Sequence, residues 1–298
     1  MTTQVLAKSS FFFLRDRIEQ DIARSIVDFG PKTKLRDACE YALLSGGKRL
    51  RPIIVMLMAE ALDRELPAHP SALAIEFFHT ASLIADDLPC MDNDDERRSK
   101  PALHKVYGES IALLASYALI CAGFRKIYEN AELMKEGKIP YNQRADLVCT
   151  VALESATSCA GILGATGGQF LDLFPPPLNL ETLREVIYKK TVTLFEGSFV
   201  LGWLFGGGDL SGLDKIKKVA YHLGMAFQIA DDISDTCQDD QSRRELNSVK
   251  VLGKERSVAL FHHEMEQFRH SMSSLGLLTP SFEKMGELLA KQVQNDLY

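Results

Sequence analysis

The sequence has 298 residues, of which 46% are hydrophobic and 25% are charged, a composition typical of a globular chain with a sizeable core. The formal net charge of −6 and the lack of a long Lys/Arg run argue against nucleic-acid binding. Six cysteines are scattered without a CxxC pair, which indicates reduced thiols in a cytoplasmic protein and argues against a disulfide framework or a zinc site.

The hydrophobic runs of the chain are short. The uncharged run of residues 110–124 falls below the roughly 20 residues that a membrane-spanning helix needs. We therefore expect a buried helix there and no membrane span. The first residues contain no hydrophobic segment typical of a secretory signal.

Helical spacing dominates the pattern of apolar residues. Such spacing runs over residues 11–29, with Ser9 or Ser10 as a candidate N-cap, and residues 33–44 predict a second helix. Turn signals separate further helical stretches at residues 46–47, 136–137, 175–177 and 206–208. No strand-period alternation, internal repeat or low-complexity segment is present, so the predicted fold class is all-α.

A basic loop follows the second predicted helix. Gly46-Gly47 breaks the helix, and Pro52 suits the first position of the next one. Lys48 and Arg51 then lie at a helix N-terminus, where free N–H groups and the helix dipole favour an anion such as a diphosphate. The alternative is a solvated basic loop.

The stretch 86–96 is the most acidic part of the chain, with six acidic residues among eleven. It follows an apolar run, residues 72–85, which predicts a buried helix that ends at Asp86 and Asp87. Clustered carboxylates without a nearby His or Cys suit Mg²⁺, which prefers one or two carboxylates together with substrate phosphates. The alternative is a solvated acidic turn.

A second Asp-Asp pair lies after another apolar helical run. Asp231 and Asp235 are four residues apart and Gln228 precedes Asp231 by three, so the three side chains are expected on one helix face. Two such helices facing each other across a cavity would hold a diphosphate with Mg²⁺ between them. Because both acidic motifs must converge for this, we expect a single domain over residues 1–298.

The chain resembles the trans-isoprenyl diphosphate synthases of the farnesyl and geranylgeranyl diphosphate synthase group. Five motifs carry the resemblance in family order between about residues 40 and 260: SGGKRLRP at 45–52, DDLPCMD at 86–92, GGQFLDL at 167–173, Lys190-Thr191, and DDISD at 231–235. The resemblance implies a helical bundle around a deep central cavity. It also implies a homodimer.

The resemblance assigns roles to individual residues. The metal ligands for Mg²⁺ would be Asp86, Asp87, Asp92, Asp231, Asp232 and Asp235. Isopentenyl diphosphate would be bound by Gly47, Lys48, Arg51, His79 and Arg98. The allylic diphosphate and its cation would be held by Arg97, Gln169, Lys190, Thr191, Gln228 and Lys254.

The implied reaction joins isopentenyl diphosphate to an allylic diphosphate (dimethylallyl, geranyl or farnesyl) in trans geometry. Ionisation of the allylic substrate is followed by condensation and by loss of a proton to the released diphosphate. A class I terpene cyclase shares the implied fold but has no use for the basic loop. A non-catalytic partner subunit of a heteromeric synthase would normally lack one acidic motif, and this chain has both.

The resemblance implies that product length depends on the residues just before Asp86. Ala81 and Ser82 lie about one helical turn earlier, where the growing prenyl tail would pass. Relatives that stop at farnesyl typically carry an aromatic residue at the position of Ala81, so we expect geranylgeranyl diphosphate. Tyr117 could close the channel from an opposite helix, which keeps farnesyl diphosphate as the alternative.

The chain departs from the family pattern at four places. Ala85 stands where relatives often have His, Ser99 replaces the usual Gly, and Ser116-Tyr117 replaces a Gly-Asp pair. Residues 238–250 are irregular where the family has a Gly-Lys flap, which leaves the role of Lys254 open.

Overall fold

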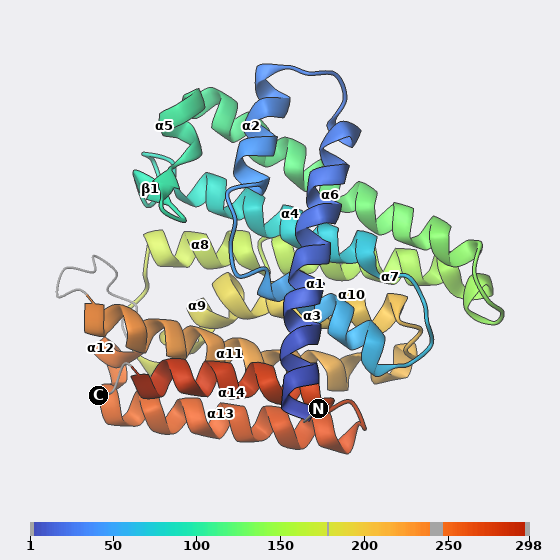
Figure 1. Ribbon diagram of the computed structural model, residues 1–298. Coiled ribbons are helices and arrows are strands. Elements are labelled where there is room, and N and C mark those ends of the chain that lie inside the picture. Colours follow the sequence, from blue (N-terminus) through green and yellow to red (C-terminus); the bar gives the residue numbers. More distant parts are fainter. Residues whose placement is uncertain (1–2, 178, 239–246, 296–298) are drawn as a thin grey trace. The chain divides into compact units, whose positions relative to one another are not determined.

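The computed structural model describes residues 3–177, 179–238 and 247–295 (Figure 1). Helices make up most of this described part, and its strands are the antiparallel pair β1 (Glu96–Arg97) and β2 (Lys100–Pro101). The prediction of an all-α fold is therefore confirmed. The irregular segment noted at 238–250 lies partly outside the described residues.

The chain divides into two compact units. The N-terminal unit comprises Phe11–Thr157 and Val200–Gly208, and the C-terminal unit comprises Met1–Ser10, Ser158–Phe199 and Asp209–Tyr298. The first acidic motif belongs to the N-terminal unit and the second to the C-terminal unit. A single domain in which both motifs meet stays a prediction.

The N-terminal unit is built from the helices of the first half of the chain. They are α1 (Thr3–Ser25), α2 (Lys34–Leu43), α3 (Leu50–Ala61), α4 (His69–Asp86), α5 (Leu103–Tyr107), α6 (Glu109–Lys135) and α7 (Ala145–Ala160), with the first residues of α1 and the last of α7 in the C-terminal unit. Ser9 and Ser10 lie inside α1, so the predicted N-cap there is wrong. A 3-10 turn, Ile26–Phe29, continues α1 to Gly30, where a φ of 92° ends the helical path.

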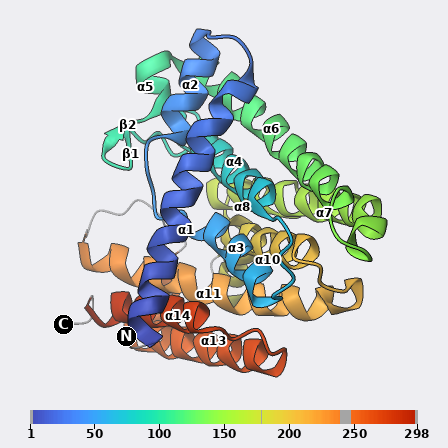
Figure 2. The ribbon, with the colours of Figure 1, turned by 45° about the vertical axis from the view of Figure 1, so that its right-hand side comes forward.

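The core of the N-terminal unit lies along α4 and α6, which run side by side (Figures 1 and 2). α4 is apolar on nearly all sides and buries most of its residues, as expected for a central helix. A Cβ on Gly123 of α6 would lie 2.6 Å from the ring of Phe78, so the glycine allows α6 to approach that ring. The side chain of Asn130 on α6 accepts bonds from the Ser71 N–H and hydroxyl (3.0 and 2.6 Å), which satisfies a backbone donor in the first turn of α4.

The helices of the C-terminal unit follow the same principle. They are α8 (Ala165–Leu173), α9 (Leu180–Ile187), a π-helical turn (Tyr188–Val192), α10 (Thr193–Phe205), α11 (Leu213–Gln238), α12 (Ser248–Leu252), α13 (Lys254–Ser274) and α14 (Pro280–Asn295), and α10 ends in the N-terminal unit. α11, α13 and α14 lie side by side in both ribbon views (Figures 1 and 2). Their core contains the fully buried rings of Phe199, Phe268 and Phe282, whose centroids lie 5.9 to 6.4 Å apart.

Two stretches of the described chain are long and apolar enough to cross a membrane by length and composition: Glu109–Lys135, which is α6, and Tyr141–Leu173. Core helices of globular proteins meet the same criteria. α6 is buried on one face, where Ala112, Ala115 and Leu119 are fully buried, and it exposes Leu113, Leu114 and Tyr117.

Candidate active site

The first acidic motif begins where α4 ends. Asp86 is the last residue of α4, and the chain then folds back so that the Asp92 N–H donates to the Asp86 carbonyl oxygen at 2.8 Å. Both residues are partly exposed. No three His, Cys, Asp or Glu side chains of the described residues are grouped so as to hold a metal ion by themselves. The carboxylates of Asp86 and Asp92 are of the type that fits Mg²⁺, which takes its other ligands from phosphates and water.

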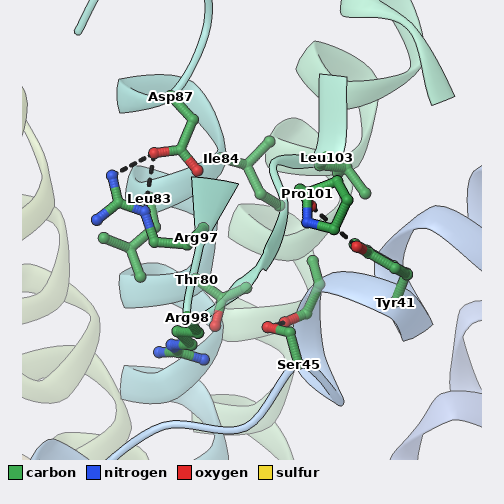
Figure 3. Close-up of a pocket in the computed structure, with 11 residues that line it drawn as sticks. Tyr41, Ser45, Thr80, Leu83, Ile84, Asp87, Arg97, Arg98, Pro101 and Leu103 are labelled. Carbon is green, nitrogen blue, oxygen red and sulfur yellow. Dashed lines mark hydrogen bonds and ion pairs between the residues drawn. The ribbon is translucent and has the colours of Figure 1, made fainter. Parts of the chain in front are cut away.

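Asp87 is placed differently from Asp86. Its side chain is buried, and its Oδ1 accepts from Arg97 Nε at 2.9 Å and also from Arg97 Nη2 (Figure 3). Arg97 Nη2 also donates to Asp94 Oδ2 at 2.8 Å. Burial raises the pKa of the Asp87 carboxyl, and the hydrogen bonds and charge of Arg97 oppose that shift. The structure thus pairs a predicted metal ligand with a predicted phosphate-binding arginine.

A hairpin that the sequence pattern did not indicate carries the two arginines. β1 ends at Arg97, and the turn residues Arg98 and Ser99 have φ values of 56° and 59°. Positive φ at both central residues is typical of the type I′ turn, which favours Gly. Strands of two residues are too short to give an alternating pattern, so no signal in residues 96–101 predicted them. The position of Ser99 also explains why a Gly is usual there.

Arg98 lies against the loop that contains Gly46 and Gly47. Its Nη1 donates to the Gly46 carbonyl oxygen, and its Nη2 lies 3.7 Å from Glu76 Oε1. A Cβ on Gly47, whose φ is 134°, would lie 2.7 Å from Arg98 Cζ. Gly47 therefore lets a guanidinium group lie directly on the backbone.

The three basic residues after Gly47 lie in different environments. Lys48 is exposed, Arg49 is buried and Arg51 is partly buried. α3 begins at Leu50, so Pro52 is its third residue and not its first as predicted. Arg49 precedes the helix with a φ of 50°.

His79 contributes a neutral ring to this cluster. Burial, followed by the charges of Arg51, Arg98, Arg49 and Arg97, holds the pKa of His79 well below its usual range. Its Nε2 accepts from Arg51 Nη1 at 3.3 Å, which leaves the ring proton on Nδ1. That buried Nδ1 has no hydrogen-bond partner among the described residues, as expected for a donor that meets a ligand oxygen.

A small cavity of about 30 Å³ lies beside the hairpin of β1 and β2 (Figure 3). Its wall includes Asp87, Arg97, Arg98, Ser45 and Thr80, and the buried Thr80 Oγ1 has no partner in the described part of the chain. A volume of that size holds about two water molecules and excludes a prenyl chain.

Two acidic residues of this cluster were missed by the sequence analysis. Glu76 is 1% exposed and accepts from Arg49 Nη1, and Glu19 accepts from Arg49 Nε at 2.8 Å. The sequence did contain a signal for Glu76, because it is the only Asp, Glu, Lys or Arg in the mostly apolar stretch 70–85. Glu19 lies among many charged residues and had no such signal.

The predicted chain-length residues lie on α4 and α6. Ala81 is 1% exposed, and its carbonyl oxygen accepts from Ser116 Oγ at 2.9 Å. Tyr117 is 55% exposed. The α6 residue that faces Ala81 is therefore Ser116, and Tyr117 does not face it. Ser82 is partly exposed and donates to the His79 carbonyl oxygen.

In the C-terminal unit, Lys190 and Thr191 lie in the π-helical turn between α9 and α10. A Cβ on Gly168 of α8 would lie 2.2 Å from the Lys190 backbone nitrogen, so α8 and this turn touch through their backbones. Lys190 Nζ bonds to Asp172 Oδ2 on α8. Gln169 of the same helix is partly exposed. π-turns occur often at functional sites, and the sequence pattern here had predicted only an ordinary helix.

The second acidic motif is held by a chain of hydrogen bonds. Thr191 Oγ1 donates to Gln228 Oε1 at 2.7 Å, and Gln228 Nε2 donates to Asp232 Oδ1 at 2.9 Å. The other oxygen of Asp232 accepts from the Ser248 N–H at 2.7 Å, at the start of α12. Burial raises the pKa of Asp232, and these hydrogen bonds oppose the shift.

The polar stripe predicted on α11 is divided. Gln228 bonds to Asp232, whereas Asp231 is partly exposed and accepts from Gln292 of α14 at 3.4 Å. Asp235 is exposed. Lys254 is the exposed first residue of α13, after Gly253 at a φ of 82°.

Comparison with known proteins gives consistent matches. The sequence pattern described as polyprenyl synthetase matches residues 32–246. A heterodimeric geranylgeranyl pyrophosphate synthase large subunit 2 of Arabidopsis thaliana is 32% identical, over 96% of this chain and 78% of the relative. A chloroplastic geranylgeranyl pyrophosphate synthase of Catharanthus roseus is 38% identical, over 70% of this chain and 57% of the relative.

Solved structures agree with these matches. An FPP/GFPP synthase from Zymomonas mobilis superposes with a TM-score of 0.79 at 28% identity, covering 97% of this chain and 99% of that chain. A geranyltranstransferase from Thermotoga maritima superposes with a TM-score of 0.77 at 28% identity, covering 96% and 99%.

Proposed function

The chain belongs to the polyprenyl synthetase family, and on that premise we propose that it joins isopentenyl diphosphate to an allylic diphosphate in trans geometry. The proposed product is geranylgeranyl diphosphate, with farnesyl diphosphate as the alternative. The observation that carries the proposal is the basic cluster of the N-terminal unit. It combines Gly47, Lys48, Arg51 and Arg98 with a neutral His79 whose buried Nδ1–H lacks an acceptor among the described residues.

This cluster supports binding of isopentenyl diphosphate by its chemistry. Guanidinium groups match phosphate oxygens, and the imidazole N–H adds a neutral donor. A terpene cyclase, the competing enzyme class, has no second diphosphate to place here. The contacts of Arg97 with Asp87 and Asp94 direct that arginine to the acidic motif, where the allylic diphosphate would lie.

The metal assignment is part of the proposal. Asp86, Asp92, Asp231 and Asp235 would hold Mg²⁺, with Asp87 and Asp232 beside them. When bound, Mg²⁺ supplies positive charge to the departing diphosphate. Asp87 and Asp232 are both buried and accept bonds from protein donors, which supports a lesser share for them in direct metal binding.

The chain's own groups complete the reaction. Arg97 and Lys190 would bind oxygens of the allylic diphosphate, with Gln169 and Lys254 near it. Thr191 would turn its hydroxyl oxygen toward the allylic cation, because its proton is given to Gln228 Oε1. Gln228 keeps that orientation because its NH₂ group donates to Asp232. No side-chain base is required, since the released diphosphate can accept the proton.

We also propose a homodimer located in the cytoplasm. Exposed apolar side chains on α6, with Leu113, Leu114, Tyr117 and Tyr128 between 39% and 55% exposed, support association of two copies. Cys39, Cys90, Cys121 and Cys149 are free thiols, which suits a reducing compartment, and cell fractionation would test the location. The partner-subunit hypothesis remains the competitor, and turnover by the isolated chain would exclude it.

The decisive experiment incubates the purified chain with Mg²⁺, isopentenyl diphosphate and each allylic primer, followed by product chromatography. Asp86→Ala and Asp231→Ala should each reduce turnover about 100-fold or more, because each removes charge stabilisation of the leaving group. Chelation of divalent metal should abolish turnover. Asp95→Ala is the matched control, since this exposed aspartate in the same acidic stretch bonds to Lys105 and should leave turnover unchanged. Metal-independent turnover, or near-wild-type rates in both variants, would contradict the proposal.

A further inference from the structure

Glu76 has no role in the reaction described above, although it lies beneath the basic cluster. We propose that Glu76 is the positioning residue of the isopentenyl diphosphate site: it fixes Arg98 in the orientation that receives the diphosphate. The inference rests on the proposed function and adds a residue on α4 that no motif singled out.

The burial of Glu76 demands an explanation. A carboxylate that is 1% exposed in an apolar helix is strongly unfavourable unless cations compensate it. Its Oε1 accepts from Arg49 Nη1 and lies 3.7 Å from Arg98 Nη2. This buried oxygen therefore pairs with two arginines from different segments: Arg49 of the loop before α3 and Arg98 of the hairpin.

Arg49 faces the protein interior. Its side chain is fully buried, and its remaining donors bond to both oxygens of Glu19 (2.8 and 3.2 Å) and to the Leu43 carbonyl oxygen (2.5 Å). Because these partners occupy the guanidinium group of Arg49 on several sides, Arg49 holds Glu76 in place and does not bind a substrate.

Arg98 faces the site, with 18% of its side chain exposed. The Gly46 carbonyl oxygen binds its Nη1, the Gly47 backbone supports the plane of the guanidinium, and Glu76 lies behind its Nη2. A group fixed on these three sides loses little rotamer freedom when it binds a phosphate oxygen.

Charge explains why a carboxylate is needed at this position. Arg49, Arg51 and Arg98 lie in one cluster beside a histidine that is neutral, and among the described residues Glu76 and Glu19 are the carboxylates that pair with Arg49 and Arg98. Without Glu76, Arg49 and Arg98 would repel each other, and the more exposed Arg98 would move away.

The test substitutes Glu76→Gln, which keeps the shape and removes the charge. We expect the Kd of isopentenyl diphosphate, measured by calorimetry, and its KM to rise about tenfold, a change of about 1.4 kcal/mol. The KM of the allylic primer should stay within about twofold, because the loss is confined to one substrate. Equal effects on both substrates, or no change for either, would overturn the proposal.

A double-mutant cycle shows whether Glu76 acts through Arg98. Arg98→Ala should weaken isopentenyl diphosphate binding, and Glu76→Gln should add nothing further in that background. Fully additive losses would contradict a positioning role. Arg98→Lys keeps the charge but cannot contact Gly46 and Glu76 together, so it should bind as weakly as Arg98→Ala, and wild-type binding would count against the proposal.

Two further variants guard against misfolding and indirect effects. Glu76→Leu combined with Arg49→Met replaces a buried ion pair with apolar groups, which proteins often tolerate, and should also weaken isopentenyl diphosphate binding, because Arg98 loses the carboxylate behind its Nη2. Glu264→Gln is the matched control, since this buried carboxylate bonds to His222 Nδ1 at 2.7 Å in the C-terminal unit. It should leave the KM of isopentenyl diphosphate unchanged.

The outcomes separate the two proposals. If the wild-type chain neither binds isopentenyl diphosphate nor makes a polyprenyl diphosphate, the proposed function is wrong. If the wild type is active and Arg98→Ala impairs it while Glu76→Gln matches the wild type, only the role of Glu76 is wrong.

Discussion

At the scale of residues, the small side chain of Ala81 leaves room for the prenyl tail near the end of α4 in the proposed function. Ala81 is buried, and Ser116 Oγ donates to its carbonyl oxygen at 2.9 Å, so α4 and α6 are in close contact there. A ring at this position must either project into the path of the prenyl tail or strain the core, at a cost of about 1–3 kcal/mol.

We therefore predict that Ala81→Tyr shifts the product from geranylgeranyl toward farnesyl diphosphate, as read by product chromatography. Thermal unfolding of the variant should show a modest loss, which separates blocking from misfolding. Tyr117→Ala should leave the product length as it is, because the Tyr117 side chain is 55% exposed. A longer product from Tyr117→Ala would show that Tyr117 restricts the tail.

Arginines that are close in the sequence lie in different environments in the structure. Arg49 and Arg51 are two positions apart, yet the first is fully buried and bonds to two glutamates, while the second is partly exposed beside His79. Arg97 and Arg98 are adjacent, and each bonds to a different buried acid. Under the proposed function, Asp87 would direct Arg97 to the allylic diphosphate, and Glu76 would direct Arg98 to isopentenyl diphosphate.

At the scale of elements, the close backbone contact between α8 and the π-turn constrains a predicted site. The missing side chain of Gly168 lets α8 touch the backbone of Lys190. That backbone cannot move without displacing both Lys190 and Thr191.

We predict that Gly168→Ala lowers turnover at least about tenfold and also lowers the Tm, because backbone strain destabilises this contact. The matched control is Gly286→Ala in α14, where the nearest atom is the flexible end of Met265 at 3.0 Å. That variant should be active and equally or slightly more stable, since alanine has the better helix propensity by about 1 kcal/mol. Similar effects of both substitutions would contradict the special role of Gly168.

At the scale of the molecule, the exposed apolar side chains of α6 call for a partner. Leu113, Leu114 and Tyr117 lie on one face of α6, and monomers rarely expose such patches without a function. Association of two copies would cover this face.

We predict a dimer in sedimentation experiments, and Leu114→Asp should shift it toward monomer, because burial of an unpaired charge in an interface is unfavourable. Val27→Asp is the control, since Val27 is an exposed apolar residue outside α6 and its variant should stay dimeric. A monomeric wild type would contradict the proposed association.

The sequence by itself determined the helices, the end of α4 at the first acidic motif and the family, because apolar spacing, glycines and short motifs are local features of the chain. It did not predict the hairpin of Arg97 and Arg98 or the π-turn of Lys190. The tertiary structure alone decided which charged groups are buried: Asp87 with Arg97, Asp232 with Gln228 and Ser248, and Glu76 with Arg49. Burial of a charge requires a compensating partner. Each of these partners comes from another segment of the chain or another turn of the helix, and the spacing of residues in the sequence does not predict such contacts.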